Sequence, residues 1–192
     1  MKLTAENSKG EKMKYRLARS MKECMKTMSV DNITVKQITE NCGVTRQTFY
    51  RNFMDKFDLI NWYFDKLLAK SFEHMGMGKT VYDALVKKFT YIQKEKLFFK
   101  MAFKSDDQNC LRDHDFELIL DFYENLIREK TGRIPDETIH CILEMYCQSS
   151  IYMTVKWVLG ELKCAPEGLA KILVDGMPGK LSELFEKLKI LS

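Results

Sequence analysis

The stretch from Ile33 to Phe53 constrains the fold of this 192-residue chain more than any other, because it contains two closely spaced helix starts. Thr34 is followed three residues later by Gln37, which is the spacing of a reciprocal capping box. Thr45 is a second candidate N-cap. Gly43 lies between them, where the first helix should end and where a positive φ is favoured. Two short helices joined by a tight glycine-containing turn predict a helix-turn-helix.

The second short helix predicts a face that reads DNA. Phe49 and Phe53 are four residues apart, so both should face the core and turn the polar residues outward. A helix-turn-helix places the first turn of its second helix against base edges, where arginine and glutamine each make paired hydrogen bonds with purines. The residues on or beside this outward face are the candidate DNA contacts: Thr34, Thr45, Arg46, Gln47, Thr48, Tyr50, Arg51, Asn52 and Lys56.

Within this set we expect two roles. Thr45, Arg46 and Gln47 should contact the bases. Phosphates should be bound by free backbone amides at the start of the first short helix, near Thr34, and by the positive charge of Lys56. The alternative is that the arginines are only solvated and that the threonines serve only as caps. Asp55 is a third candidate N-cap, and Met54 is spaced to pack on Leu59 as a hydrophobic staple.

Charge is distributed unevenly along the chain, although the net charge is only +4. Residues 1–60 contain 12 Lys and Arg against 7 Asp and Glu, whereas the remainder contains 19 against 20. A local basic excess favours a nucleic-acid partner for the first segment. An excess of this size can also arise by chance.

Composition and motifs exclude several classes. Hydrophobic residues make up 45% of the chain and strand-like alternation is absent, so we expect an ordered all-α protein. No catalytic triad, paired carboxylate or phosphate-binding loop is present, so an enzyme is not predicted. The three histidines and six cysteines lack metal-ligand spacing, and neither a metal nor a cofactor is expected. The sequence has neither the apolar core of a signal peptide nor an apolar run long enough to span a membrane, so we expect a cytoplasmic protein. Its cysteines should then be free thiols, and the alternative is that one of them is a redox sensor.

The segment ITVKQITENCGVTRQTFYRNFMDKFDLI resembles the DNA-binding domain of the TetR/AcrR family of bacterial transcriptional regulators, over about residues 10–65. The resemblance implies that Thr45, Arg46 and Gln47 face bases and that Tyr50 and Lys56 contact phosphate. Asn52 departs from the family pattern, which often has histidine there. A later segment, YCQSSIYMTVKWVLGELKCAPEGLAKIL, resembles the DhaS-type subgroup of the same family.

We therefore expect an N-terminal three-helix DNA-binding domain over residues 1–60 and a helical effector-binding and dimerisation domain over 61–192. Predicted helices include residues 8–28 and one that begins at Pro135 and ends near Leu162, and the two glycines in MGMGKT (75–80) should interrupt the helical periodicity. The resemblance implies a homodimer that binds operator DNA and responds to an unknown small molecule. The alternative is control by a partner protein.

Two sets of residues are candidates for these further roles. Aromatic side chains that could line an effector pocket are Phe98, Phe99, Phe103, Phe122, Tyr123, Tyr146 and Tyr152. Aromatics at helical spacing also make ordinary cores, which is the alternative. Between Glu144 and Lys156 the sequence has no charge, so that helix should be buried on more than one side. Candidate dimer contacts are Cys147, Ser150, Met153, Trp157, Leu184 and Leu188.

Overall fold

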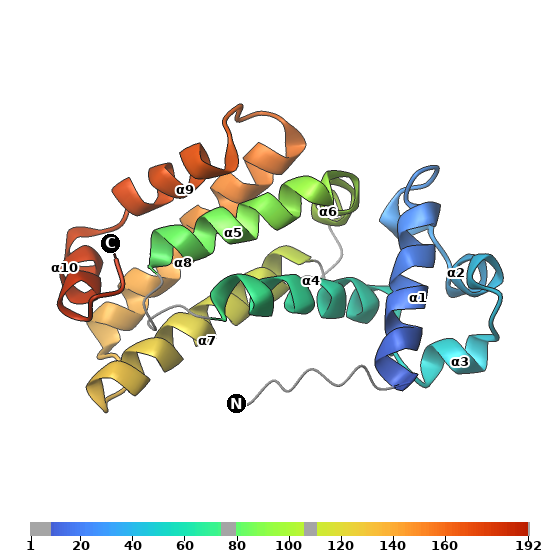
Figure 1. Ribbon diagram of the computed structural model, residues 1–192, viewed down its shortest axis with the longest axis horizontal. Helices are drawn as coiled ribbons and strands as arrows, with labels where there is room; N and C mark the ends of the chain where they lie inside the picture. The colour runs from blue at the N-terminus through green and yellow to red at the C-terminus, as the bar shows by residue number, and fades with distance from the viewer. Residues whose placement is uncertain (1–8, 74–79, 106–110, 192) are drawn as a thin grey trace.

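The computed structural model describes residues 9–73, 80–105 and 111–191, which form helices with no strand among them (Figure 1). The predicted all-α fold is confirmed. The N-terminal helices are α1 (Lys9–Cys24), the short 3₁₀ helix η1 (Val30–Asn32), α2 (Val35–Cys42) and α3 (Arg46–Tyr50), followed by the connecting helix α4 (Lys56–Phe72). The later helices are α5 (Val81–Lys94), α6 (Lys96–Phe103), α7 (Leu111–Thr131), α8 (Glu137–Leu159), α9 (Pro166–Asp175) and α10 (Gly179–Lys187). None of these helices is long and apolar enough to cross a membrane.

Three local predictions are wrong. The first helix ends at Cys24, because the chain turns at Met25, which is buried. The helix predicted to begin at Pro135 has Asp136 as its N-cap, whose carboxylate accepts from the amide of Ile139 at 2.9 Å. Met54 is 80% exposed and does not pack as a staple. Residues 74–79, which include both glycines of the predicted break, lie outside the described residues.

Helix α4 runs from the N-terminal helices into the C-terminal bundle (Figure 1), and it contributes buried residues along its length to the hydrophobic core. The ring of Trp62 packs edge-on against Tyr15 of α1 and near Phe53, with centroids 5.0 and 5.6 Å away. Two residues later, Phe64 packs against Phe99 of α6. The predicted domain boundary at residue 60 therefore falls inside a continuous helix, and it stays a prediction.

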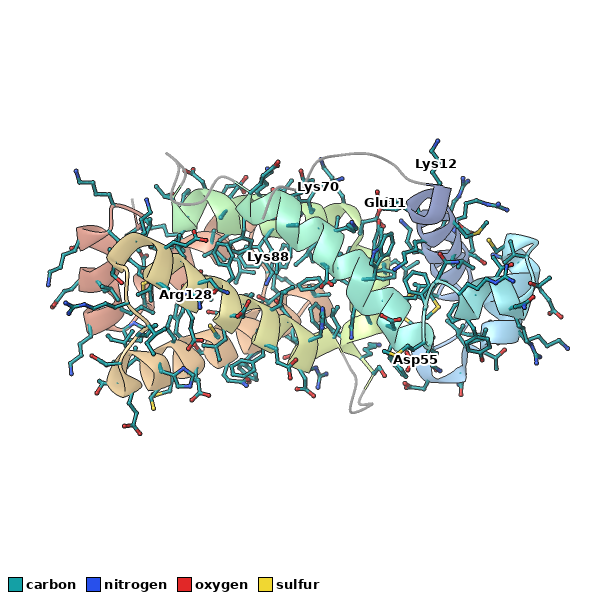
Figure 2. The ribbon with its side chains drawn as sticks, turned by 90° about the horizontal axis from the view of Figure 1, so that it is seen from below. Glu11, Lys12, Asp55, Lys70, Lys88 and Arg128 are labelled. Carbon is teal, nitrogen blue, oxygen red and sulfur yellow. The ribbon has the colours of Figure 1, made fainter. Side chains whose placement is uncertain are left out.

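The C-terminal half is a bundle of α5 to α10 around a core rich in aromatic side chains. The middle of this bundle also holds an ion pair between Lys88 of α5 and Asp115 of α7, whose side chains are 4% and 0% exposed. Figure 2 shows Lys88 among the packed helices, whereas the labelled Lys12 extends away from the end of α1. Burial tends to raise the pKa of the Asp115 carboxyl, and the charge and hydrogen bonds of Lys88 oppose that rise.

Candidate nucleic-acid interface

Helix α2 begins at the predicted capping box. The hydroxyl of Thr34 accepts from the amide of Gln37 at 3.2 Å, and the side-chain oxygen of Gln37 accepts from the amide of Thr34 at 2.8 Å. The helix ends at Gly43, whose φ of 67° is left-handed, as the sequence predicts. These two features set the length of α2 and turn the chain sharply towards α3.

Helix α2 is also hydrogen-bonded to α1 by a polar cluster that the sequence pattern did not predict. The Ser20 hydroxyl donates to the carbonyl of Ile38 at 2.7 Å, and the Asn41 amide donates to that hydroxyl at 2.9 Å. Arg16 donates to the carbonyl of Cys42 at 3.2 Å, at the C-terminal end of α2. The only signal for this cluster in the sequence was Ser20, a small polar residue next to the apolar stripe of α1. In the structure Ser20 is 4% exposed.

Helix α3 is capped by Thr45, whose hydroxyl accepts from the amide of Thr48 at 3.2 Å. Phe49 and Phe53 hold the helix on the core, because their rings are almost fully buried and lie 5.8 Å apart. The ammonium of Lys14 lies over the Phe53 ring at 4.8 Å and so braces the end of α3 from α1. Helix α3 is therefore short but held at both ends.

The outward face of α3 is exposed as the spacing of the two phenylalanines predicts. Arg46, Gln47, Tyr50 and Arg51 are all exposed, with Tyr50 at 59%. The side chains of Arg46, Gln47 and Arg51 have no hydrogen-bond or ion-pair partner within the described ranges 9–73, 80–105 and 111–191. Their donors are thus free for an external ligand, which is what base or phosphate recognition requires.

The other candidate DNA contacts already have partners inside the protein. The hydroxyls of Thr45 and Thr48 lie 3.0 Å apart, and Asn52 donates to the carbonyl of Thr48 at 2.8 Å. The ammonium of Lys56 donates to three carbonyls of the preceding loop, at 2.7 Å to Val30, 2.7 Å to Asp31 and 3.0 Å to Ile33. Sequence spacing could not reveal these bonds of Lys56, because the acceptors are backbone groups more than twenty residues away.

The aromatic residues predicted to line an effector pocket lie in two different environments. Six of them are packed in or against the core of the C-terminal half: Phe98, Phe99, Phe103, Phe122, Tyr123 and Tyr146. Their rings contact one another, as in the Phe98–Phe99 and Tyr123–Tyr146 pairs at 5.3 and 6.4 Å. Burial raises the pKa of the Tyr146 hydroxyl, which donates to the carbonyl of Leu173. Tyr152 is 63% exposed and does not join them.

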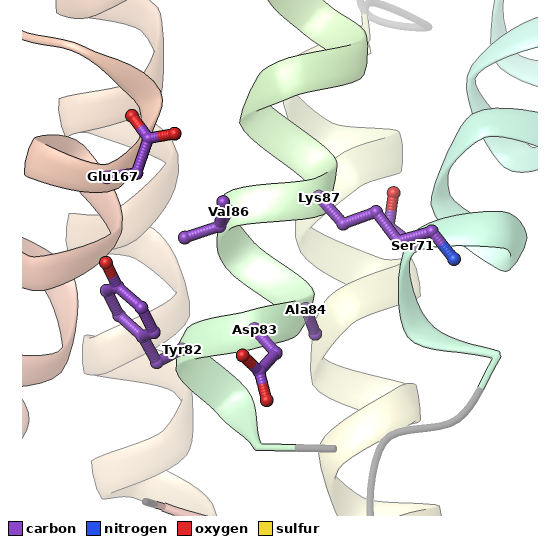
Figure 3. A pocket seen from close by; sticks show the side chains of 7 residues that line it. All are labelled: Ser71, Tyr82, Asp83, Ala84, Val86, Lys87 and Glu167. Atoms are coloured by element: carbon purple, nitrogen blue, oxygen red, sulfur yellow. The ribbon is translucent and has the colours of Figure 1, made fainter.

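A cavity of about 240 Å³ lies elsewhere, on the outer side of α5. Figure 3 shows Tyr82, Val86 and Glu167 on its α9 side, and Lys87 and Ser71 on its α4 side. None of the seven predicted aromatic residues lines this cavity. The sequence contained no signal for it, because the lining residues of α5 are joined by Ser71 of α4 and by Glu167 of the distant α9.

The residues predicted to contact a second copy are also divided. Cys147, Ser150 and Trp157 face the inside of the subunit, with 0%, 8% and 8% exposed, so they are not available to a partner in this conformation. Met153, Leu184 and Leu188 are half-buried. Burial raises the pKa of Cys147 to about 12, which keeps the thiol protonated and unreactive at neutral pH.

The outer side of α8 has a different set of side chains. Met145 and Tyr152 are 69% and 63% exposed, and Gln148 and Ser149 lie exposed between them. We call these four residues the α8 strip. Their spacing places them on one side of the helix.

Among the residues that the structure describes, no group of histidine, cysteine and carboxylate side chains could hold a metal ion.

Residues 79–179 match a TetR-type family model described as a transcriptional regulator C-terminal region. No curated protein matches. The described fold is similar to a TetR transcriptional regulator from Streptococcus agalactiae, with 20% identity, a TM-score of 0.62, and coverage of 85% of this chain and 92% of the other.

Two further solved structures are similar. The dihydroxyacetone kinase operon activator DhaS is 18% identical, with a TM-score of 0.57 and coverage of 94% of this chain and 98% of DhaS. NalD from Pseudomonas aeruginosa, the secondary repressor of a multidrug efflux pump, is 17% identical, with a TM-score of 0.60 and coverage of 87% and 96%. At these identities the likeness concerns the fold.

Proposed function

The chain belongs to the TetR family of DNA-binding transcriptional regulators, and we propose that it binds its operator as a homodimer whose affinity is controlled through the C-terminal domain. The observation that carries this proposal is the exposed first turn of α3. Arg46 and Gln47 stand there with unused donors, on a helix fixed by two buried phenylalanines.

Base recognition is proposed for Arg46 and Gln47, with Thr45 beside them. Arginine can donate two hydrogen bonds to O6 and N7 of guanine, and glutamine can pair with N6 and N7 of adenine. Tyr50, one turn further on, offers a ring to a thymine methyl or a hydroxyl to phosphate. Arg51 supplies positive charge to the backbone on the same exposed side.

The remaining candidates are proposed to act at the phosphate backbone or behind it. Thr34 opens α2, so a phosphate there would meet free amides at a helix N-terminus. Asn52 and Thr48 support the end of α3 through their internal bond. The ammonium of Lys56 donates its three N–H groups to carbonyls of the loop. We therefore propose that Lys56 positions the loop before Thr34 and does not contact DNA directly.

Dimerisation is proposed through the α8 strip. Large apolar side chains that lie exposed together on one helix are typical of a protein interface. In a twofold arrangement the same strip would meet itself, and the helix between Glu144 and Lys156 has no charge to oppose this. The half-buried Leu184 of α10 and Leu188, which follows that helix, are proposed to lie at its edge. Two copies would read two half-sites about 34 Å apart.

Control by a small molecule is the proposed input. A repressor of similar fold, FadR from Thermus thermophilus, was solved in complex with lauroyl-CoA. In this chain two regions are proposed to receive an effector: the cavity beside α5 and the aromatic core around α6, which would have to open. Control by a partner protein is the second candidate. It is favoured by the small size of the cavity.

Selection of bound sequences from random double-stranded DNA tests the DNA-binding part. The wild-type chain should enrich one half-site sequence. Arg46→Ala should lose preference at one base position, at a cost of about 1–3 kcal/mol there. Arg133→Ala is the matched control, because Arg133 is also exposed but lies between α7 and α8. Equal loss on all sequences would refute base recognition by Arg46, and no enrichment by the wild-type chain would refute the proposed function.

A further inference from the structure

Helix α6 has an unusual position, because it belongs to the C-terminal core and yet both of its ends contact the helix-turn-helix domain. Figure 1 shows it on the side of the C-terminal bundle that faces α1. Phe99 and Phe103 are fully buried, and the carbonyl of Phe103 accepts from Arg112 of α7 at 2.6 Å. These contacts make α6 a fixed part of the C-terminal domain.

The first contact lies at the N-terminal end of α6. Glu95 precedes the helix, and its two carboxylate oxygens lie 2.9 and 2.7 Å from the ammonium of Lys22 in α1. The hydroxyl of Tyr63 in α4 donates to the same carboxylate at 3.1 Å. The Tyr63 ring in turn packs edge-on against Phe98 of α6 at 5.0 Å. Three helices therefore meet at one carboxylate.

The second contact lies at the C-terminal end of α6. Ser105, which is 1% exposed, donates its hydroxyl hydrogen to the carboxylate of Asp31 at 2.6 Å. Asp31 is part of η1 in the helix-turn-helix domain, and its own carbonyl accepts from Lys56. The same short segment thus connects the end of α6 to the start of α4 and leads directly into the cap of α2.

These two contacts join the C-terminal domain to the helix-turn-helix domain in addition to the covalent connection through α4. A single connecting helix allows its two attached domains to bend and twist about that helix. Two polar contacts, one at each end of α6, restrain both motions. Partly exposed ion pairs add little to folding stability, so the main physical effect of these contacts is on the angle between the domains.

We infer that Glu95 and Ser105 are positioning residues for DNA recognition, which fix the angle of the helix-turn-helix domain and thereby the half-site spacing that the protein reads. The inference rests on the proposed homodimer, because spacing has meaning only for two linked domains. In a symmetric dimer any change of this angle moves both recognition helices, so the spacing between them changes twice as much.

The test uses the full-length chain and a library in which two copies of the half-site enriched by the wild-type protein are separated by spacers of different length. The wild-type chain should prefer one spacer. Glu95→Ala/Ser105→Ala should keep the half-site sequence but lower the preference for that spacer over its neighbours by about fivefold or more. Lys171→Ala is the control, since it removes an exposed pair with Asp175 within α9.

Lys22→Met removes the first contact from the other domain, so it tests the inference if the double variant does not fold. An unchanged spacer distribution in these variants would overturn the inference while leaving the proposed function intact. A wild-type chain that enriches a half-site but shows no spacer preference would overturn it as well. A wild-type chain that enriches no sequence would overturn both.

Discussion

The ammonium of Lys88 lies 2.9 and 3.1 Å from the two carboxylate oxygens of Asp115, and this pair is closed off from water in the middle of the C-terminal bundle. The ammonium also lies 5.4 Å from the ring centre of Phe64, on α4. A charged pair in such a place depends on both partners, because either charge alone would be buried without compensation.

Removing one partner of this pair should therefore be severe. We expect Lys88→Met to lower the free energy of unfolding by about 3–5 kcal/mol, measured by urea denaturation. Lys88→Met/Asp115→Leu should recover most of the loss, because no charge is then left buried. A single variant as stable as the wild type would show that the pair is not needed, and a double variant as unstable as the single one would point to lost packing instead.

Stability should depend on pH through His114. Its ring nitrogen lies 2.5 Å from the Asp65 carboxylate on α4, and this hydrogen bond raises the pKa of His114, although burial opposes the rise. The stabilisation is complete below the unfolded pKa of about 6.5 and is lost as the pH rises through the folded pKa.

The free energy of unfolding should thus be constant well below about pH 6.5 and fall as the pH rises through and above that value, and the fall should be smaller in His114→Gln. Asp65→Asn should flatten the profile in the same way, because it removes the partner instead of the titrating group. Urea denaturation at a series of pH values measures this. Parallel profiles for the wild type and both variants would contradict the assignment.

A variant of Lys56 should show whether this residue stabilises the loop before Thr34 or contacts a DNA phosphate directly. If it braces the loop, Lys56→Met should lower the free energy of unfolding by about 1–3 kcal/mol, because three carbonyls lose their donor. DNA binding should weaken with no change in its salt dependence. A direct phosphate contact would instead lower the salt slope by about one. Binding to the selected operator at several salt concentrations separates the two, and a lower slope with unchanged stability would refute the brace.

The α8 strip should decide the oligomeric state. Tyr152→Glu places a charge at a side chain that is 63% exposed, so it should disturb a twofold contact without harming the fold. We expect a monomer by light scattering and a loss of operator affinity of at least about tenfold, since one half-site is then bound alone. Ile172→Glu on α9, where the side chain is 42% exposed, should change neither property. A dimeric Tyr152→Glu would exclude the strip as the interface.

The local structure of the helix-turn-helix was predictable because its determinants are near one another in sequence. The capping box of Thr34, the left-handed Gly43 and the buried Phe49 each follow from spacing within a few residues. The contacts of Lys56 and Glu95 were not predictable, because each joins residues from separate elements. A pattern along one helix cannot show which other helix will supply the partner.

The α8 helix shows the same limit in a different form. Its lack of charge predicted burial on more than one side, but the structure buries only the inward side and leaves Met145 and Tyr152 exposed. Hydrophobic pattern alone does not separate the side facing its own subunit from the side left exposed. Cys147 and Trp157 face the inside of the subunit. Trp157 packs near Phe89 of α5, and its ring N–H donates to the carbonyl of Cys164 in the segment before α9. The exposed Met145 and Tyr152 are recognisable only once that packing is known.

The sharing of α4 between the two cores has a consequence for how such chains can be recombined. Trp62 serves one core and Phe64 the other, within less than one helical turn. Each residue inserted in an α-helix rotates the rest of that helix by about 100° and moves it by about 1.5 Å. A chimaera that joins this DNA-reading segment to another regulator would have to preserve the helical phase of α4 at the junction, so crossover points that shift the phase should yield proteins with one misaligned core.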